Sequence, residues 1–214
     1  MSPLRQAKGF TLVELAIALT IIGLIIGGLV LGGSAVMESA RTSTLLGQIK
    51  DLAAASRDFK NRYGYFPGDL PNAGTLIKTE VISSDCDKPA AGKVGDGVVD
   101  TTPITESTCA LEHLVKARML IKVEMEGGNY VIRHPFGGGT VALGATAANE
   151  NVVRVSNLPC NIALQIDGKL DNASTTPLAA GSGFVTGLDS SNASIDTCTP
   201  GGANDPVTFL LIRY

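Results

Sequence analysis

One long apolar run decides how this chain folds: FTLVELAIALTIIGLIIGGLVLGGSAVM, residues 10–37. Glu14 is the only charged residue in the run. The run is longer than a typical buried core helix and long enough to span about 30 Å of hydrocarbon. A carboxylate at the centre of a membrane helix costs about 2.5–3.5 kcal/mol, and less towards an end. The sequence therefore predicts a transmembrane helix in which Glu14 has a partner or a function.

The residues around the start of the run form a specific pattern. Residues 8–15 are KGFTLVEL, preceded by a short basic leader. This pattern resembles the class III signal of type IV prepilins and of the pseudopilins of type II secretion, over about residues 5–35. The resemblance implies that a prepilin peptidase cleaves after Gly9 and that Phe10 is then N-methylated. It also implies that Glu14 guides subunits into a growing filament by pairing with the Phe10 ammonium of a neighbour.

The charges beside the run predict its orientation. Arg5 and Lys8 lie in the leader, residues 1–9, and the positive-inside rule places them in the cytoplasm. We therefore expect a single-pass protein with a cytoplasmic N-terminus and its remainder in the periplasm or outside the cell. The resemblance implies that the membrane is the bacterial inner membrane and that the subunit later enters a pilus or pseudopilus. The formal net charge is −3, and without the leader 15 basic side chains would face 20 acidic ones, giving −5. No basic cluster predicts nucleic-acid binding.

Beyond the run the pattern becomes amphipathic over residues 38–63. Apolar and small residues recur at helical spacing on one face, at Leu45, Ile49, Leu52, Ser56, Phe59 and Tyr63. Gly64 suits the position after a helix, and Pro67 prevents continuation. We expect one helix from about Thr11 to Tyr63, whose second half packs on a head domain of residues 64–214.

Glycines interrupt the apolar half at Gly23, Gly27, Gly28, Gly32 and Gly33. Their spacing suits close packing of helices through small residues. Ordinary tolerance of glycine in membrane helices explains them equally well.

The head domain contains further predicted elements. The expected helices cover residues 107–120 and, capped by Asn157 with Pro159 in the first turn, residues up to 170. The expected strands are residues 130–134, 140–143, 152–155 and 207–213, with one more near Phe184 in a loop of residues 171–206. The predicted fold class is α+β: a long N-terminal helix packed on a small antiparallel sheet, which is pilin-like by the resemblance above.

Four cysteines all follow the apolar run: Cys86, Cys109, Cys160 and Cys198. An even number in an oxidising compartment predicts two disulfides, with three connectivities open. Pairing of the nearest neighbours favours Cys86–Cys109 and Cys160–Cys198. Free buried thiols are the alternative.

An acidic loop offers the only metal candidate. Asp85, Asp87, Asp96 and Asp100 could supply oxygen ligands to calcium. The loop lacks the spaced carboxylates of an EF-hand, so a solvated acidic turn is favoured and no cofactor is expected.

No catalytic set is recognisable in the sequence. The two histidines, His113 and His134, belong to no triad, and we expect both to be structural. The chain is therefore predicted not to be an enzyme.

Two classes of function fit the sequence. The first is a structural subunit of a type IV pilus or a type II secretion pseudopilus, with other subunits, prepilin peptidase and the inner membrane as partners. The second is a periplasmic binding or enzymatic domain, anchored or secreted, for which Gly33-Ser34-Ala35 is a tolerable cleavage site. Against the second, the apolar run exceeds the 7–15 residues of a secretory signal. A mature chain beginning at methylated Phe10 supports the first class, and one beginning at Val36 the second.

Overall fold

The computed structural model describes most of the chain. The described residues are 10–78, 80–87, 94–101, 105–121, 123–171, 178, 183–189, 191, 193–195, 198–202 and 205–214, with the backbone alone at 29–34 and 105. The chain divides into two compact units, Met1–Arg41 and Thr42–Tyr214. The predicted leader, residues 1–9, lies outside the described part.

Helix α1 covers Leu12–Tyr63, the helix that the sequence predicts. Gly64 ends it with φ +82° and donates its backbone N–H to the carbonyl of Lys60 at 2.8 Å. A left-handed residue after the last helical turn is the usual way to stop a helix, and glycine adopts it without strain.

The second half of α1 supplies one wall of the head domain's core. Leu45, Leu52 and Phe59 are fully buried and Ile49 nearly so, as their spacing predicts. Ser56 on the same face is also buried, and its hydroxyl lies 2.8 Å from the hydroxyl of Tyr214. This contact satisfies a polar group that would otherwise be costly to bury.

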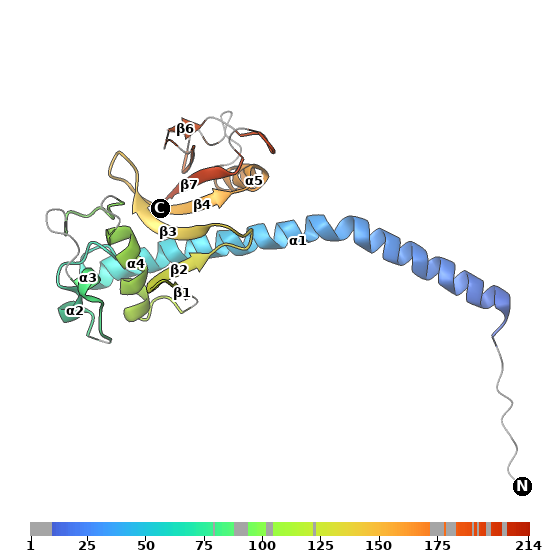
Figure 1. Cartoon of the computed structure of the whole chain (residues 1–214), viewed down its shortest axis with the longest axis horizontal. Helices are drawn as coiled ribbons and strands as arrows, with labels where there is room; N and C mark the ends of the chain where they lie inside the picture. Colours follow the sequence, from blue (N-terminus) through green and yellow to red (C-terminus); the bar gives the residue numbers. More distant parts are fainter. Residues whose placement is uncertain are drawn as a thin grey trace, which may run out of the picture. The chain divides into compact units, whose positions relative to one another are not determined.

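The other wall is a seven-stranded sheet of order β1-β2-β3-β4-β7-β5-β6, in which every pair is antiparallel (Figure 1). The last strand in sequence, β7, thus lies between β4 and β5. The strands are β1 (Glu124–Glu126), β2 (Asn129–Arg133), β3 (Thr140–Ala145), β4 (Asn151–Leu158), β5 (Val185–Leu188), β6 (Ser194–Ile195) and β7 (Val207–Arg213). The α+β fold class is therefore confirmed, and β1 and β6 are strands that the sequence analysis did not predict.

The described part of the head domain contains four further helices: α2 (Ala73–Leu76), α3 (Ser84–Asp87), α4 (Thr105–Lys116) and α5 (Cys160–Leu170). The two shortest, α2 and α3, were not predicted.

Helix α4 ends before the predicted residue 120. Arg118 adopts a left-handed conformation, φ +59°, and donates its N–H to the carbonyl of Val115 at 2.9 Å. The N–H of Met119 reaches the carbonyl of Leu114 at 2.9 Å. These two bonds form a Schellman motif, which closes the helix although no glycine marks its end.

The predicted cap of α5 by Asn157 is wrong. Asn157 lies in β4 with φ +51°, and its side-chain amide donates to the carbonyl of Gly138 at 3.1 Å. The first N–H of α5, that of Cys160, instead donates to the Asp205 carboxylate at 2.9 Å. This cap comes from far along the chain, so the local sequence could not indicate it. Pro159 precedes the helix rather than lying in its first turn.

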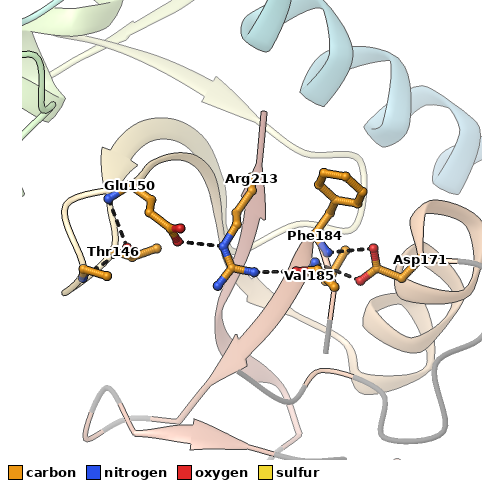
Figure 2. Close-up of polar contacts among 8 residues, drawn as sticks. Thr146, Glu150, Asp171, Phe184, Val185 and Arg213 are labelled. Atoms are coloured by element: carbon orange, nitrogen blue, oxygen red, sulfur yellow. Dashed lines mark hydrogen bonds and ion pairs between the residues drawn. The ribbon is translucent and has the colours of Figure 1, made fainter. Parts of the chain in front are cut away.

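The residue that follows α5, Asp171, hydrogen-bonds the backbone at the start of β5. Asp171 accepts the backbone N–H groups of Phe184 and Val185 at 2.7 and 2.9 Å (Figure 2). Arg213 of β7 bonds the carboxylate of Glu150 at 2.7 Å and the carbonyl of Gly183. These contacts fix a strand inside the segment that the sequence analysis assigned mainly to a loop.

The head domain contains two disulfides, Cys86–Cys109 and Cys160–Cys198, with Cα–Cα distances of 5.3 and 5.7 Å. They are the pairs expected from nearest neighbours in sequence. The first links α3 to α4, and the second links the start of α5 to the segment after β6. No described cysteine is free.

Candidate functional site

The N-terminal motif lies at the start of α1. The predicted cleavage point, Gly9, is outside the described residues, and the description begins with Phe10, whose side chain is 83% exposed. Neither Phe10 nor Thr11 is helical, and α1 starts at Leu12. Phe10 therefore stands just ahead of the first helical turn.

Thr11 caps this helix. Its hydroxyl accepts the N–H of Glu14 at 3.2 Å, and its carbonyl accepts the N–H of Leu15 at 3.2 Å. A Thr followed three residues later by Glu is the sequence signature of a capping box, a signal that our sequence analysis did not use. Glu14 thus lies in the first turn, where a negative charge is favoured by the helix dipole.

The carboxylate of Glu14 differs from the other polar side chains near the start of α1, which form hydrogen bonds. Thr11 accepts the bond just described, and the hydroxyl of Thr20 donates to the carbonyl of Ile17 at 2.8 Å. Within residues 10–28, the Glu14 carboxylate is the one polar side-chain group that makes no hydrogen bond or ion pair. In an apolar environment such a group needs a partner that the described residues do not supply.

The apolar side chains of this segment have no cover in the single chain. The large hydrophobic residues from Leu12 to Ile26 are 51–88% exposed, and they occupy every side of the helix. A helix that is apolar all round requires lipid or other helices around it. A Cβ added at Gly23, Gly27 or Gly28 would meet nothing within 4 Å. No contact with the described residues of the chain therefore requires glycine at these positions, and close helix packing through them stays a prediction about neighbouring chains.

The span predicted over residues 10–37 includes residues 29–34, whose side chains lie outside the description. Among the described residues, no helix combines the length and the hydropathy needed to cross a membrane.

The acidic loop of the head domain does not gather the predicted calcium ligands. Asp87 accepts the N–H of Gly74 at 2.7 Å, and Asp96 accepts the N–H of Val98 at 2.9 Å. Asp85, next to Cys86, lies near the hydroxyl of Ser84 at 3.4 Å. In the described part of the chain, no group of three or more His, Cys, Asp and Glu residues could hold a metal ion.

Buried carboxylates nevertheless organise this region. Asp69 is fully buried and accepts the N–H groups of Gly95 and of Gly97, the latter at 2.8 Å. Glu106 is 4% exposed, and its carboxylate accepts the N–H of Asp100 at 2.8 Å. Burial raises the pKa of Glu106 to about 7, and the nearby carboxylates of Asp69 and Asp100 add to the effect.

We expect Glu106 to make the head domain less stable as the pH rises. Its pKa of about 7 when folded exceeds the ordinary 4.5, so folding binds a proton between these values. The stability it contributes is complete below pH 4.5 and is lost as the pH rises through about 7. Glu106→Gln keeps an acceptor for Asp100 without the charge, so it should gain about 2–3 kcal/mol relative to wild type between pH 4.5 and 8.

Denaturant unfolding of both proteins at the two pH values measures this difference. The exposed Glu124→Gln serves as the control and should show no such change. If wild type and Glu106→Gln differ in free energy of unfolding by the same amount at both pH values, Glu106 does not take up a proton on folding.

Both histidines have structural surroundings. Nδ1 of the buried His113 accepts the N–H of Gly68 at 2.9 Å, so Nε2 carries the proton and donates to the carbonyl of Cys86 at 2.9 Å. Burial lowers the pKa of His113, which keeps it neutral. His134 likewise bonds the carbonyl of Ser156 at 2.9 Å through Nε2. Each ring connects backbone segments.

Comparison with known families agrees with the N-terminal geometry. The family model described as the prokaryotic N-terminal methylation motif matches residues 4–30. The chain thus carries a type IV prepilin-like signal, which indicates a prepilin peptidase substrate of the type IV pilin or pseudopilin kind. The chain has no significant match among curated proteins or solved structures.

Proposed function

We propose that this chain is a structural subunit of a type IV pilus or of a type II secretion pseudopilus, and not an enzyme. The observation that carries the proposal is the methylation motif over residues 4–30, which runs directly into α1. Before assembly the subunit is held in the inner membrane by residues 10–37, with the leader in the cytoplasm and the head domain in the periplasm.

The unpartnered Glu14 supports assembly through this helix. Cleavage after Gly9 creates an ammonium group at Phe10, which is exposed and precedes the first helical turn. Glu14 lies in that turn with no partner among the described residues of its own chain. Because an isolated charge is costly in apolar surroundings, the ammonium of one subunit and the carboxylate of the next favour one axial offset.

The head domain supports a structural role in a different way. Among its described residues, the disulfides link α3 to α4 and the start of α5 to the segment after β6. The side chains of His113, Asp69 and Glu106 bond backbone groups of the fold. The exposed apolar residues of α1, from Leu12 to Ile26, are then the surface that neighbouring subunits cover in a filament core.

Mass spectrometry of the mature chain tests the proposal. We expect the N-terminal peptide to begin at Phe10 and to carry one methyl group on its amine. An N-terminus at Val36 would overturn the proposal in favour of an ordinarily secreted binding or enzymatic domain. Shearing of filaments from cells that produce the chain should release it together with other subunits.

A further inference from the structure

The sheet has a second face that does not belong to the core. One face of β3, β4 and β7 packs in the core through Val141, Val155 and Leu210. The alternate residues of these strands, on the opposite face, line a groove of about 880 Å³. This volume lies within the usual range for small-molecule sites, about 300–1,000 Å³. Most of the groove residues come from strands adjacent in the sheet, and the strand register fixes their positions.

Arg154 of β4 is the central charge of this groove. In the register it lies beside Ala142 of β3 on one side and Leu211 of β7 on the other. Its guanidinium carbon lies 4.3 Å from the centre of the Phe209 ring, and its Nε is buried without a hydrogen-bond partner. Burial lowers the pKa of Arg154, and no carboxylate among the described residues counteracts that effect.

The other charges of the groove neutralise each other. Arg213 and Glu150 also line it, and they form an ion pair at 2.7 Å (Figure 2). The positive charge of Arg154 is therefore left uncompensated within the lining. The Nε of Arg154 is nevertheless removed from water without a carboxylate partner, and charged groups taken out of water are normally paired.

Gly144 of β3 makes room for this arginine. A Cβ at Gly144 would lie 2.7 Å from Cδ of Arg154 and 2.7 Å from Cγ2 of Thr101. Because Gly144 has no positive φ, its backbone accepts any residue, and the missing side chain serves the packing of Arg154.

Thr186 of β5 adds an unused polar group in the same row of the sheet. It pairs with Leu211, which pairs with Arg154. Thr186 is 6% exposed, and its hydroxyl is buried with no hydrogen-bond partner. Buried polar groups almost always have partners, so the hydroxyl of Thr186 and the Nε of Arg154, unpartnered in one groove, are candidate contacts for a ligand.

We propose that this groove binds a small organic acid, that is, a carboxylate carried on an apolar body. Arg154 takes the carboxylate through parallel N–H donors, since the guanidinium fork matches carboxylate geometry. The hydroxyl of Thr186 donates to the same ligand, and Phe209, Leu188 and Leu211 contact its apolar part. One uncompensated cation favours a monoanion over a phosphate. The proposal does not depend on filament assembly, because none of these residues belongs to α1.

Fluorine NMR of para-fluorophenylacetate with the full-length chain in a nonionic detergent tests this site. The wild-type protein should broaden the ligand signal saturably, and the neutral para-fluorophenylacetamide should bind at least about tenfold more weakly. Arg154→Gln should weaken binding of the acid at least about tenfold, since it removes a charged hydrogen-bond donor. Arg133→Gln, which removes an arginine of β2 outside the groove, should leave binding unchanged.

Two further variants separate binding from folding. Gly144→Ala should displace Arg154 and weaken binding of the acid, and Thr186→Val should weaken it less. Both variants should keep the wild-type circular dichroism spectrum and both disulfides. Equal binding of acid and amide, or unchanged binding in folded Arg154→Gln or Gly144→Ala, would overturn the proposal. So would the absence of binding to wild type at millimolar ligand.

Discussion

Replacing Gly9 by Leu is expected to leave the chain in its uncleaved form, with residues 1–9 retained. Gly9 is the last residue before the predicted cleavage point, and glycine lets the backbone approach a peptidase site closely. A pocket shaped for a small residue discriminates by about 10–200-fold for a single extra methylene. Leucine adds a whole branched side chain, so we expect cleavage to fall by at least about a hundredfold.

Intact mass and gel mobility of the membrane-bound chain measure this outcome. Ala7→Leu places the same bulk two residues before Gly9 and is the matched control, which should still be cleaved. The uncleaved protein should carry no methyl group, because Phe10 has no free amine. Mature-sized Gly9→Leu protein, at a level close to wild type, would contradict cleavage after Gly9.

The periodic features of this chain were predictable because they repeat. The bounds of α1 and the buried face containing Leu45, Leu52 and Phe59 follow from one hydrophobic period and one terminating glycine. The positions of β2, β3, β4 and β7 follow from short β-branched runs between turns. Each of these signals lies within a few residues of the element it predicts.

The features that were missed depend on residues far apart in sequence or on unusual conformations. Asp205 caps α5 at Cys160, and Arg118 takes the left-handed position that usually indicates glycine. No local pattern predicts either contact. The short strand β6 exists only because it pairs with β5, whose own position is held by Asp171.

The two candidate sites differ in the same way. The motif that contains Phe10 and Glu14 could be found from the sequence, because its residues are contiguous, whereas the role of these two residues in assembly stays a prediction. The groove around Arg154 could not be predicted, because most of its lining residues come from five strands whose order the sequence does not state. A lone arginine in a strand carries no signal until the sheet register shows that its neighbours are apolar or already paired.

Replacing Glu14 by Ala is expected to separate membrane insertion from assembly. The change removes the one unpartnered carboxylate of residues 10–28 and raises the hydrophobicity of the segment, so insertion should be normal or improved. Cleavage at Gly9 should persist, because the motif residues next to the cleaved bond are unchanged. Incorporation into filaments should fall at least about tenfold, as expected when one partner of a desolvated ion pair is truncated.

Subunit abundance in sheared filaments, relative to the total membrane pool, measures this loss. Glu14→Gln has nearly the same shape without the charge and should fail as Glu14→Ala does, whereas Glu14→Asp should assemble in part. Asp58→Ala removes an exposed carboxylate from the second half of the same helix and should assemble normally. If Glu14→Gln assembles as well as wild type, then charge neutralisation with the Phe10 ammonium is not what sets the offset between subunits. The apolar contacts of residues such as Leu12 and Leu24 would then have to define the register without it.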